Sequence, residues 1–381
     1  MFKTFKYRLY PSHTQERLLS ETIETCRRWY NTCLEERKTA WEERHESVGK
    51  YTQLRKVKDL RGANPYAANV HSHILQVVVA DLDKAFAAFF RRVKAGETPG
   101  YPRFKGRGRY NSFGLKELGN GFRLDGRRLK LSGIGRVRVR WHRSMEGEIK
   151  TVRIVCVGGK WFACFACEVE AQPLPATGQS VGVDVGISAL LTTSGGEKID
   201  NPRWYRSGET RLRVLQRSVA RKLRGGSSRR KAVGQLARHA EHISNRRKDF
   251  LNKIVCRLVE ENDLIAIEDL QISNMVHNRS LAKSILDAGW GYFRMQLQSK
   301  AEYAGRTIVA VAPAYTSKAC SNCGLLFQDF DLSIRWVRCE CGLSLDRDHN
   351  AAINILKRVG HTRSGLTWAK RPCVPAEATP L

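Results

Sequence analysis

The sequence of 381 residues contains no run of about eighteen apolar residues, the length that a membrane-spanning helix requires. Its first residues, Met1 to Lys6, also lack the apolar segment of a secretory signal. We therefore expect a cytoplasmic protein with no membrane partner. Disulfides rarely persist in that reducing compartment, so the eleven cysteines are expected to be thiols or metal ligands.

Acidic residues are scarce relative to basic ones. The 37 Asp and Glu residues face 66 Lys and Arg residues, which gives a net charge of +29. A surface this positive repels itself, and a polyanionic partner is its simplest explanation. A ribosome-type structural protein and a membrane-surface binder are the alternatives. The hydrophobic fraction of 42% suits a folded enzyme better, and no basic amphipathic helix with an exposed aromatic face stands out. We expect a nucleic-acid partner and several domains.

The first half of the chain predicts a strand, helices and then a β-rich segment. Residues 2–10 alternate in the manner of a strand, and apolar residues recur at helical spacing through residues 13–95. From Gly96 to about residue 175, short alternating runs separated by turn residues predict a small β-barrel or sandwich. Arginines in these runs would point to one face, where we favour contact with phosphates over plain solvation.

The second half predicts a mixed α/β domain. After a linker over 171–180, the apolar runs 181–186 and 264–268 read as buried strands. Between them, residues 206–248 hold fourteen Lys and Arg but only two Glu at helical spacing, with a break at 225–228. Intrahelical ion pairs cannot balance this excess, so we expect a basic helical hairpin that lines a groove for a nucleic-acid backbone.

Carboxylates lie at the ends of several of these core elements. Asp184 sits in an apolar strand, where an unpaired carboxylate costs several kcal/mol, Glu268 ends a second strand, and Asp346 and Asp348 begin a helix. Each has an alternative role, as an acceptor of backbone N–H groups, a strand-end ion pair or a helix cap. Together they favour an RNase H-like cluster in which two Mg²⁺ or Mn²⁺ ions, about 3.5–4 Å apart, assist phosphodiester hydrolysis.

Four cysteines near the C-terminus have the spacing of a zinc ribbon. Cys320 and Cys323 form one pair, Cys339 and Cys341 form a second pair, and fifteen residues separate the two pairs. Four thiolates imply a structural zinc ion, although the second pair is CxC where CxxC is usual. The CxxC at 164–167 lies in an expected strand, where residues three apart point to opposite faces, so we assign it to core packing.

The chain resembles the TnpB (OrfB) proteins of bacterial insertion sequences, which are relatives of the type V CRISPR effectors. The C-terminal matches are specific, whereas the N-terminal ones are individually weak. The resemblance rests on Tyr7 to Pro11, Cys26 to Asn31, Gly100 to Lys105, Gly182 to Gly186, Ile267 to Leu270, Thr316 to Lys318, Cys320 to Gly324 and Asp346 to Ala352.

This resemblance implies an RNA-guided DNA endonuclease whose guide RNA comes from the transposon end and pairs with double-stranded target DNA. It implies that Asp184, Glu268 and Asp348 are the catalytic metal ligands and that Asp346 is their neighbour. We expect a monomer with one RNA, associated with a bacterial or archaeal nucleoid. A nuclease-inactive, RNA-guided DNA-binding repressor and a DNA-strand transposase are the alternatives. Acids at all three positions favour a cleaving protein.

The resemblance also implies a domain order. It predicts a multidomain α/β chain with a helical recognition lobe, a wedge barrel, and a RuvC-like nuclease domain that carries the zinc ribbon. The expected limits are 1–12 for the first wedge strand, 13–95 for the recognition lobe, 96–175 for the rest of the wedge barrel, 176–318 for the nuclease domain, 319–342 for the zinc ribbon, 343–360 for the last nuclease helix and 361–381 for a disordered tail.

Overall fold

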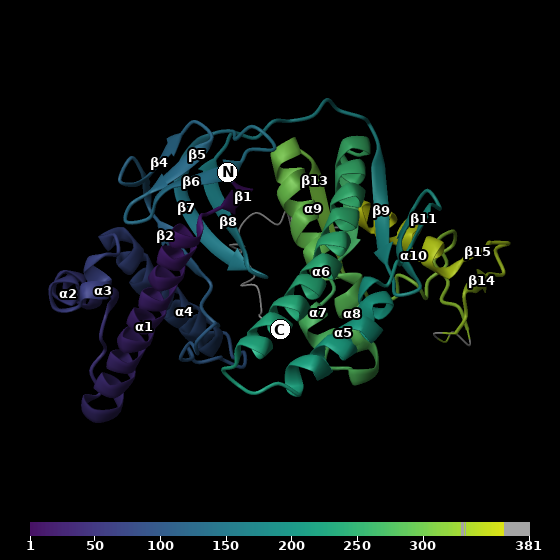
Figure 1. Ribbon diagram of the computed structural model, residues 1–381. Coiled ribbons are helices and arrows are strands. Elements are labelled where there is room, and N and C mark those ends of the chain that lie inside the picture. Colours follow the sequence, from purple (N-terminus) through teal and green to yellow (C-terminus); the bar gives the residue numbers. More distant parts are fainter. Residues whose placement is uncertain (329–330, 332, 362–381) are drawn as a thin grey trace. The chain divides into compact units, whose positions relative to one another are not determined.

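The structure is a computed structural model that describes residues 1–328, 331 and 333–361 (Figure 1). Contacts within the chain divide it into two compact units, the first from Met1 to Val169 and the second from Glu170 onward. The expected linker at 171–180 begins at this boundary. Of the tail that was expected to be disordered, residues 362–381 lie outside the described residues.

The first unit contains helices over the segment that the sequence predicts to be helical. The first of them begins at a capping box, because the Ser12 hydroxyl accepts the Gln15 backbone N–H while the Gln15 side chain accepts the Ser12 N–H. A partly buried Arg153–Asp81 ion pair of 2.8 Å connects the last helix to the sheet. The helices are α1 (His13–Arg44), α2 (Lys50–Ala63), α3 (Pro65–Ala68) and α4 (Ser72–Lys94).

The strands of this unit form one eight-stranded sheet with the order β2-β7-β8-β1-β6-β5-β4-β3. The strands are β1 (Phe2–Tyr10), β2 (Ser112–Leu115), β3 (Glu117–Leu118), β4 (Gly121–Asp125), β5 (Arg128–Leu131), β6 (Gly135–Arg140), β7 (Glu148–Val157) and β8 (Lys160–Glu168).

The small β-barrel expected here is not closed. No pairing joins the two outer strands, β2 and β3, among the residues that the structure describes. The physical reason is their size and packing, because β3 is only two residues long and β2 lies against α4 and α1. The expected arginine face is present on β6, where Arg136, Arg138 and Arg140 are exposed and the valines between them are buried.

The second unit is built around a five-stranded mixed sheet with the order β11-β10-β9-β12-β13. Strand β9 pairs antiparallel with β10 and parallel with β12, and β12 pairs parallel with β13. The mixed α/β architecture predicted for this half is therefore confirmed. The strands are β9 (Ser180–Val185), β10 (Ala189–Thr193), β11 (Lys198–Asp200), β12 (Leu264–Glu268) and β13 (Thr307–Val311), and a separate pair is β14 (Trp336–Arg338) with β15 (Ser344–Asp346).

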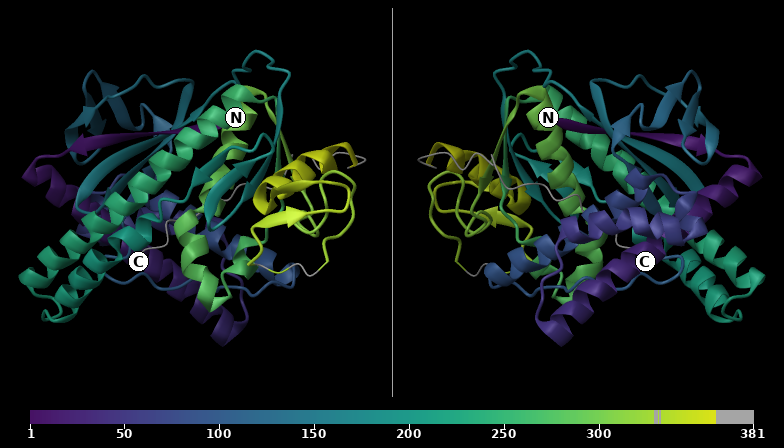
Figure 2. Two further views of the ribbon diagram at one scale, coloured as in Figure 1. Left: turned by 90° about the vertical axis from the view of Figure 1, so that its right-hand side faces the viewer. Right: turned by 90° about the vertical axis from the view of Figure 1, so that its left-hand side faces the viewer.

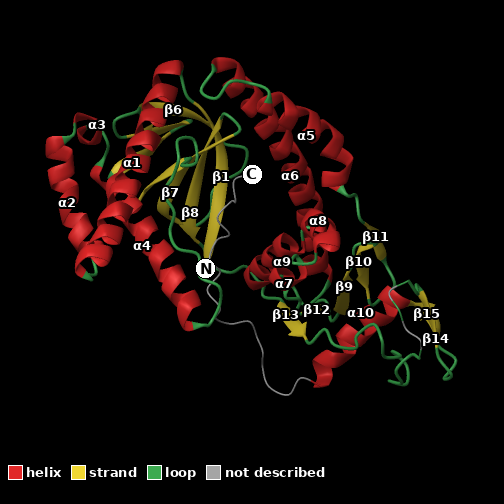
Figure 3. Cartoon of the chain, turned by 90° about the horizontal axis from the view of Figure 1, so that it is seen from below, coloured by secondary structure: helices red, strands yellow, loops and turns green. Residues whose placement is uncertain are grey.

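Helices cover both faces of this sheet (Figure 3). One face packs on α6, α8 and α9 through Val183, Ile265 and Ile267. The opposite face, which carries Ala266, packs on Ile355 of α10. The helices are α5 (Trp204–Ala220), α6 (Ser227–Glu261), α7 (Ile272–Met275), α8 (Arg279–Ala288), α9 (Trp290–Ala304) and α10 (Arg347–Lys357), followed by the 3₁₀ turn η1 (Arg358–His361).

The basic segment is a pair of helices, α5 and α6, that run side by side (Figure 2). The predicted break at Gly225–Ser228 falls where α6 begins. The Arg229 guanidinium closes the turn by donating to the carbonyls of Val219 and Lys222. None of the described helices is both long and apolar enough to cross a membrane.

A glycine allows the sheet and α10 to touch backbone to backbone. A Cβ added to Gly182 of β9 would lie 2.1 Å from the Ala352 carbonyl oxygen and 2.8 Å from the Leu356 nitrogen of α10. No side chain fits in that space, since the obstructing atoms are backbone. Gly182 therefore sets the distance between α10 and the middle strand.

We expect Gly182→Ala to lower the free energy of unfolding by about 3 kcal/mol or more, because the added methyl group forces β9 and α10 apart. Gly234→Ala is the matched control. Gly234 lies inside α6, nothing lies within 4 Å of the position that its Cβ would take, and alanine there stabilises the helix by about 0.5–1 kcal/mol. Urea unfolding of the full-length protein measures both changes. Equal stability of the two variants would contradict this role of Gly182.

Candidate active site and metal centre

Strand register brings two of the predicted carboxylates together. Val183 of β9 lies opposite Ile267 of β12 in the parallel pairing, so the next residues, Asp184 and Glu268, occupy equivalent positions on adjacent strands, about 4.8 Å apart in backbone spacing. Alternation along each strand turns both side chains away from the core on the Val183 face and toward the face that α10 covers. Two acids that are 84 positions apart in the chain are therefore neighbours.

The two aspartates at the start of α10 have different roles. Asp346 is the N-cap, because its carboxylate accepts the backbone N–H groups of Asp348 and His349. It also forms a 2.6 Å ion pair with Lys198. These contacts outweigh burial and lower the pKa of Asp346. The helix-cap alternative therefore applies to Asp346, whereas Asp348 lies in the first turn of the helix, where its partly buried carboxylate contacts Arg347 at 3.5 Å.

The electrostatics show that Asp184 shares one environment with the other acids. Burial, together with the negative charges of Glu268 and Asp348, raises the pKa of Asp184 to about 8. Burial also raises the pKa of Glu268, although a hydrogen bond from Thr316 and the positive charge of Arg358 oppose the shift. Asp184 is thus a buried acid that lies near two further acids, an arrangement that a divalent cation would stabilise, and carboxylate oxygens suit Mg²⁺ or Mn²⁺.

Several polar residues that support these acids were not assigned a role from the sequence. The Thr316 hydroxyl donates to Glu268, and the His349 imidazole is hydrogen-bonded to the Ser194 carbonyl at 3.1 Å. Asn350 and Asn354 are buried in α10 and bond to the loop after β13. One signal was available in the sequence, since two asparagines four residues apart interrupt the apolar face of a short helix.

The four predicted cysteines form a compact cluster. All of their sulfur atoms lie within 4.8 Å of one another, with Cys320 3.6 Å from Cys341 and Cys323 3.5 Å from Cys339. Thiolates about 2.3 Å from a tetrahedral zinc ion lie about 3.8 Å from each other, so the cluster fits zinc. Among the described residues, no other group of three or more such side chains is this compact, and the three carboxylates are thus spaced more widely.

A further feature of the cluster favours metal binding. The backbone N–H of Leu343 and the side chain of Asn322 donate to the Cys341 sulfur, and together they lower the pKa of Cys341 to about 6. The pKa values of the neighbouring Cys323 and Cys339 thiols are raised, so these hydrogen bonds favour the thiolate, the form that binds metal, at Cys341. The four sulfur atoms lie close together even though the second pair has CxC spacing.

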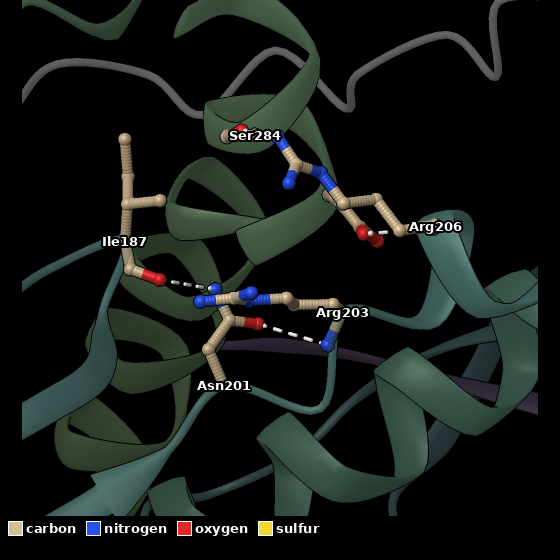
Figure 4. Close-up of a pocket in the computed structure, with 6 residues that line it drawn as sticks. Ile187, Asn201, Arg203, Arg206 and Ser284 are labelled. Carbon is tan, nitrogen blue, oxygen red and sulfur yellow. Dashed lines mark hydrogen bonds between the residues drawn. The ribbon is translucent and has the colours of Figure 1, made fainter.

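A small pocket lies beside the end of β9 (Figure 4). Asn201 donates to the Ile187 carbonyl and accepts the backbone N–H of Arg203. The pocket is also lined by Arg206 and by Asp287, whose carboxylate accepts the N–H of Tyr205 and so caps α5. The Asp287 carboxylate occupies the N-terminal end of α5, where an anion could otherwise bind. The contacts around this pocket therefore hold the start of the basic helix pair in place.

Comparison with known proteins identifies the family. Residues 164–279 match the model OrfB_IS605, described as a probable transposase, and residues 290–355 match the Cas12f1-like TNB domain. Residues 1–46, which form β1 and α1, match a helix-turn-helix domain model. The Cas12f1 chain in a cryo-EM structure with guide RNA and target DNA aligns with a TM-score of 0.59 at 13% identity, covering 93% of this chain and 98% of that one. The fold is thus that of the Cas12-type effectors.

Two curated relatives are similar to this chain over nearly its whole length. A putative RNA-guided DNA endonuclease of Streptomyces pristinaespiralis is 37% identical over 365 residues, which cover 93% of this chain and 88% of the relative. InsQ of Escherichia coli K12, another putative RNA-guided DNA endonuclease, is 31% identical over 384 residues, with 94% and 92% covered. The chain belongs to the TnpB (OrfB) family, as the sequence motifs indicated.

We expect one zinc ion per chain. Cys320→Ser should lower the zinc content and loosen the region after β13, because Cys320 is the most buried of the four ligands. Elemental analysis of the purified protein measures the zinc. Cys256→Ser in α6 is the control and should leave the zinc content unchanged, since its sulfur contacts Lys300 and lies outside the cluster. Purified protein without zinc would exclude this assignment.

The raised pKa of Asp184 predicts a pH-dependent stability of the magnesium-free protein. The folded protein keeps this proton up to about pH 8, whereas the unfolded chain releases it near about pH 4, so the free energy of unfolding falls as pH rises between these values. Asp184→Asn should remove about 1–3 kcal/mol of that decrease between pH 5 and pH 8. Denaturant unfolding at both pH values measures it.

The matched control is Asp249→Asn in α6, because Asp249 is exposed and pairs only with the nearby Lys253 among the ion pairs of the described residues. Its unfolding should follow the wild-type pH dependence. If the free energy of unfolding does not decrease from pH 5 to pH 8 in either the wild type or the Asp184→Asn variant, that result would argue against a protonated Asp184.

Proposed function

We propose that this chain is a transposon-encoded, RNA-guided DNA endonuclease that hydrolyses phosphodiester bonds at Asp184, Glu268 and Asp348. The observation that carries this proposal is the register of β9 and β12, which makes Asp184 and Glu268 neighbours on the face covered by α10. Asp348 in the first turn of α10 adds the third acid, and its charge acts on Asp184. Family membership supplies the class of reaction.

Each acid has a definite part in this proposal. Asp184 and Glu268 would hold the divalent ions, and Asp348 would add a ligand from α10. Thr316 keeps Glu268 oriented by donating to one of its oxygens. When bound, two Mg²⁺ or Mn²⁺ ions would polarise the scissile phosphate, activate the attacking water and stabilise the leaving oxygen. The four cysteines would hold a structural zinc ion in a ribbon inserted before α10.

The basic surfaces of the protein would neutralise the phosphate charges of the bound RNA and DNA. Helices α5 and α6 and the exposed arginines of β6 present cations suited to phosphate backbones. The guide RNA would come from the transposon end and pair with double-stranded target DNA, and one chain would act with one RNA. In this proposal the first unit corresponds to the recognition lobe and wedge, and the second unit to the RuvC-like nuclease domain with its zinc ribbon.

Cutting is favoured over the two alternatives. A repressor that only binds DNA has no need for a buried Asp184 beside two further acids, whose negative charges disfavour its ionisation when no metal ion is bound. A strand transposase must also join the strands it cuts. The family model carries the description of a probable transposase, but the curated relatives are described as endonucleases.

We expect Asp184→Ala to lower the rate of Mg²⁺-dependent DNA cutting by at least about 10³-fold, because one ligand of the ions is lost. Binding of RNA and target DNA should persist, since the basic surfaces are unchanged. Gel analysis of cleavage and of complex formation with the co-purified RNA measures both. Asp249→Ala in α6 is the control and should cut like the wild type. An Asp184→Ala protein that still cuts would contradict the assignment.

A further inference from the structure

The loop after β13 connects the cysteine cluster to the carboxylates. It contains Thr316, whose hydroxyl bonds to Glu268, and Cys320, the first cysteine of the cluster. Tyr315, just before Thr316, has a φ of 64°, a left-handed conformation that costs a non-glycine residue about 1–3 kcal/mol. Such a residue keeps its conformation only where the surroundings impose it.

Two asparagines of α10 hold the residues that follow Tyr315. The Asn354 amide donates to the Thr316 carbonyl at 2.9 Å and to the Ala319 carbonyl at 2.7 Å. The Asn350 amide donates to the Ala319 carbonyl at 2.8 Å, and its oxygen accepts the Ser321 N–H at 2.8 Å. These contacts bracket Cys320 on both sides.

The burial of these asparagines indicates a specific role. Asn350 is fully buried and Asn354 is 9% exposed. Asparagine is a poor helix former, and a buried amide without partners is costly, so an apolar residue would suit a buried helix face better in the absence of such partners. The same helix carries Asp348, which precedes Asn350 by two residues. The loop therefore contacts Glu268 through Thr316, and the asparagines join it to the helix that carries Asp348.

We propose that metal binding at the cysteine cluster and divalent-ion binding at the carboxylates are energetically coupled, and that Asn350 and Asn354 are the positioning residues that couple them. This inference rests on the proposed function for the identity of the carboxylate site. A metal ion at the cysteines fixes Cys320 and the residues beside it. The asparagines then hold α10 and Thr316, and these orient Asp348 and Glu268.

Coupling of this kind is reciprocal, since each ion changes the affinity for the other by the same factor. Asn350→Asp and Asn354→Asp test it, because aspartate has the same shape but cannot donate to the carbonyls of Thr316 and Ala319. Asn252→Asp in α6 is the matched control, since Asn252 accepts a hydrogen bond from Tyr292, which aspartate also accepts. Each variant is used as zinc-loaded, full-length protein.

The first measurement is Mn²⁺ affinity by electron paramagnetic resonance, with Asp184→Ala protein as the baseline for ions bound elsewhere. Asn350→Asp and Asn354→Asp should weaken Mn²⁺ binding about 10-fold, within the usual range of coupled sites. The control should stay within about twofold. Affinities of both asparagine variants that equal the wild-type value would overturn the coupling while leaving the proposed nuclease site intact.

A different failure is distinguishable. Wild-type protein that binds no more Mn²⁺ than the Asp184→Ala protein would overturn the carboxylate site and the coupling together. In the reverse direction, Mg²⁺ should make zinc harder to extract from the wild type with a zinc-selective chelator, and should have a smaller effect in the asparagine variants. Zinc retention that does not depend on Mg²⁺ in the wild type would also overturn the proposal.

Cutting assays separate positioning from general instability. The Mg²⁺ concentration for half-maximal cutting should rise about 10-fold in the asparagine variants, whereas the rate at saturating Mg²⁺ should stay within about threefold of the wild type. A variant that is only less stable loses rate at every Mg²⁺ concentration. An unchanged Mg²⁺ dependence would contradict the positioning role.

Discussion

The backbone contact between β9 and α10 at Gly182 is the constraint on which the site depends. The missing side chain lets the Ala352 carbonyl approach the strand, and any Cβ would occupy the same space. Asp184 follows two residues later on that strand, and Asp348 lies one turn before Ala352 on that helix. A wider gap would separate the acids, so the spacing of the carboxylates follows from a glycine that carries no charge.

The sheet contributes the second constraint. Parallel pairing of β9 with β12 places equivalent residues side by side, and alternation sends Asp184 and Glu268 to the face where α10 lies. The opposite face is filled by apolar residues that pack against α6 and α9. Burial raises the pKa of both acids, which makes the site unfavourable as an empty, fully ionised cluster. The same arrangement favours a cation.

The cysteine cluster lies on the chain between Glu268 and Asp348, and its position has a structural consequence. Residues 312–328 have little regular structure of their own, so their backbone groups need partners from elsewhere. Asn350 and Asn354 of α10 donate to carbonyls of this segment, and the Thr316 hydroxyl in the segment donates to Glu268. Sulfur ligands and oxygen ligands thus suit two different metals within one hydrogen-bonded assembly.

The sequence by itself indicated a nucleic-acid partner, the family, a group of four cysteines with the spacing of a zinc site and the mixed α/β class, because charge, motifs, spacing and periodicity are local properties of the chain. It also placed each carboxylate on its element. Only the tertiary structure decided that β9 and β12 pair in register, that Asp346 caps α10 while Asp348 remains beside Asp184, and that the β-rich sheet of the first unit stays open. The sequence alone assigned no role to Thr316, Asn350 or Asn354, although the spacing of the two asparagines was a signal. Such features depend on contacts between residues far apart in the chain, and no local pattern encodes which strand a hydroxyl or an amide will meet.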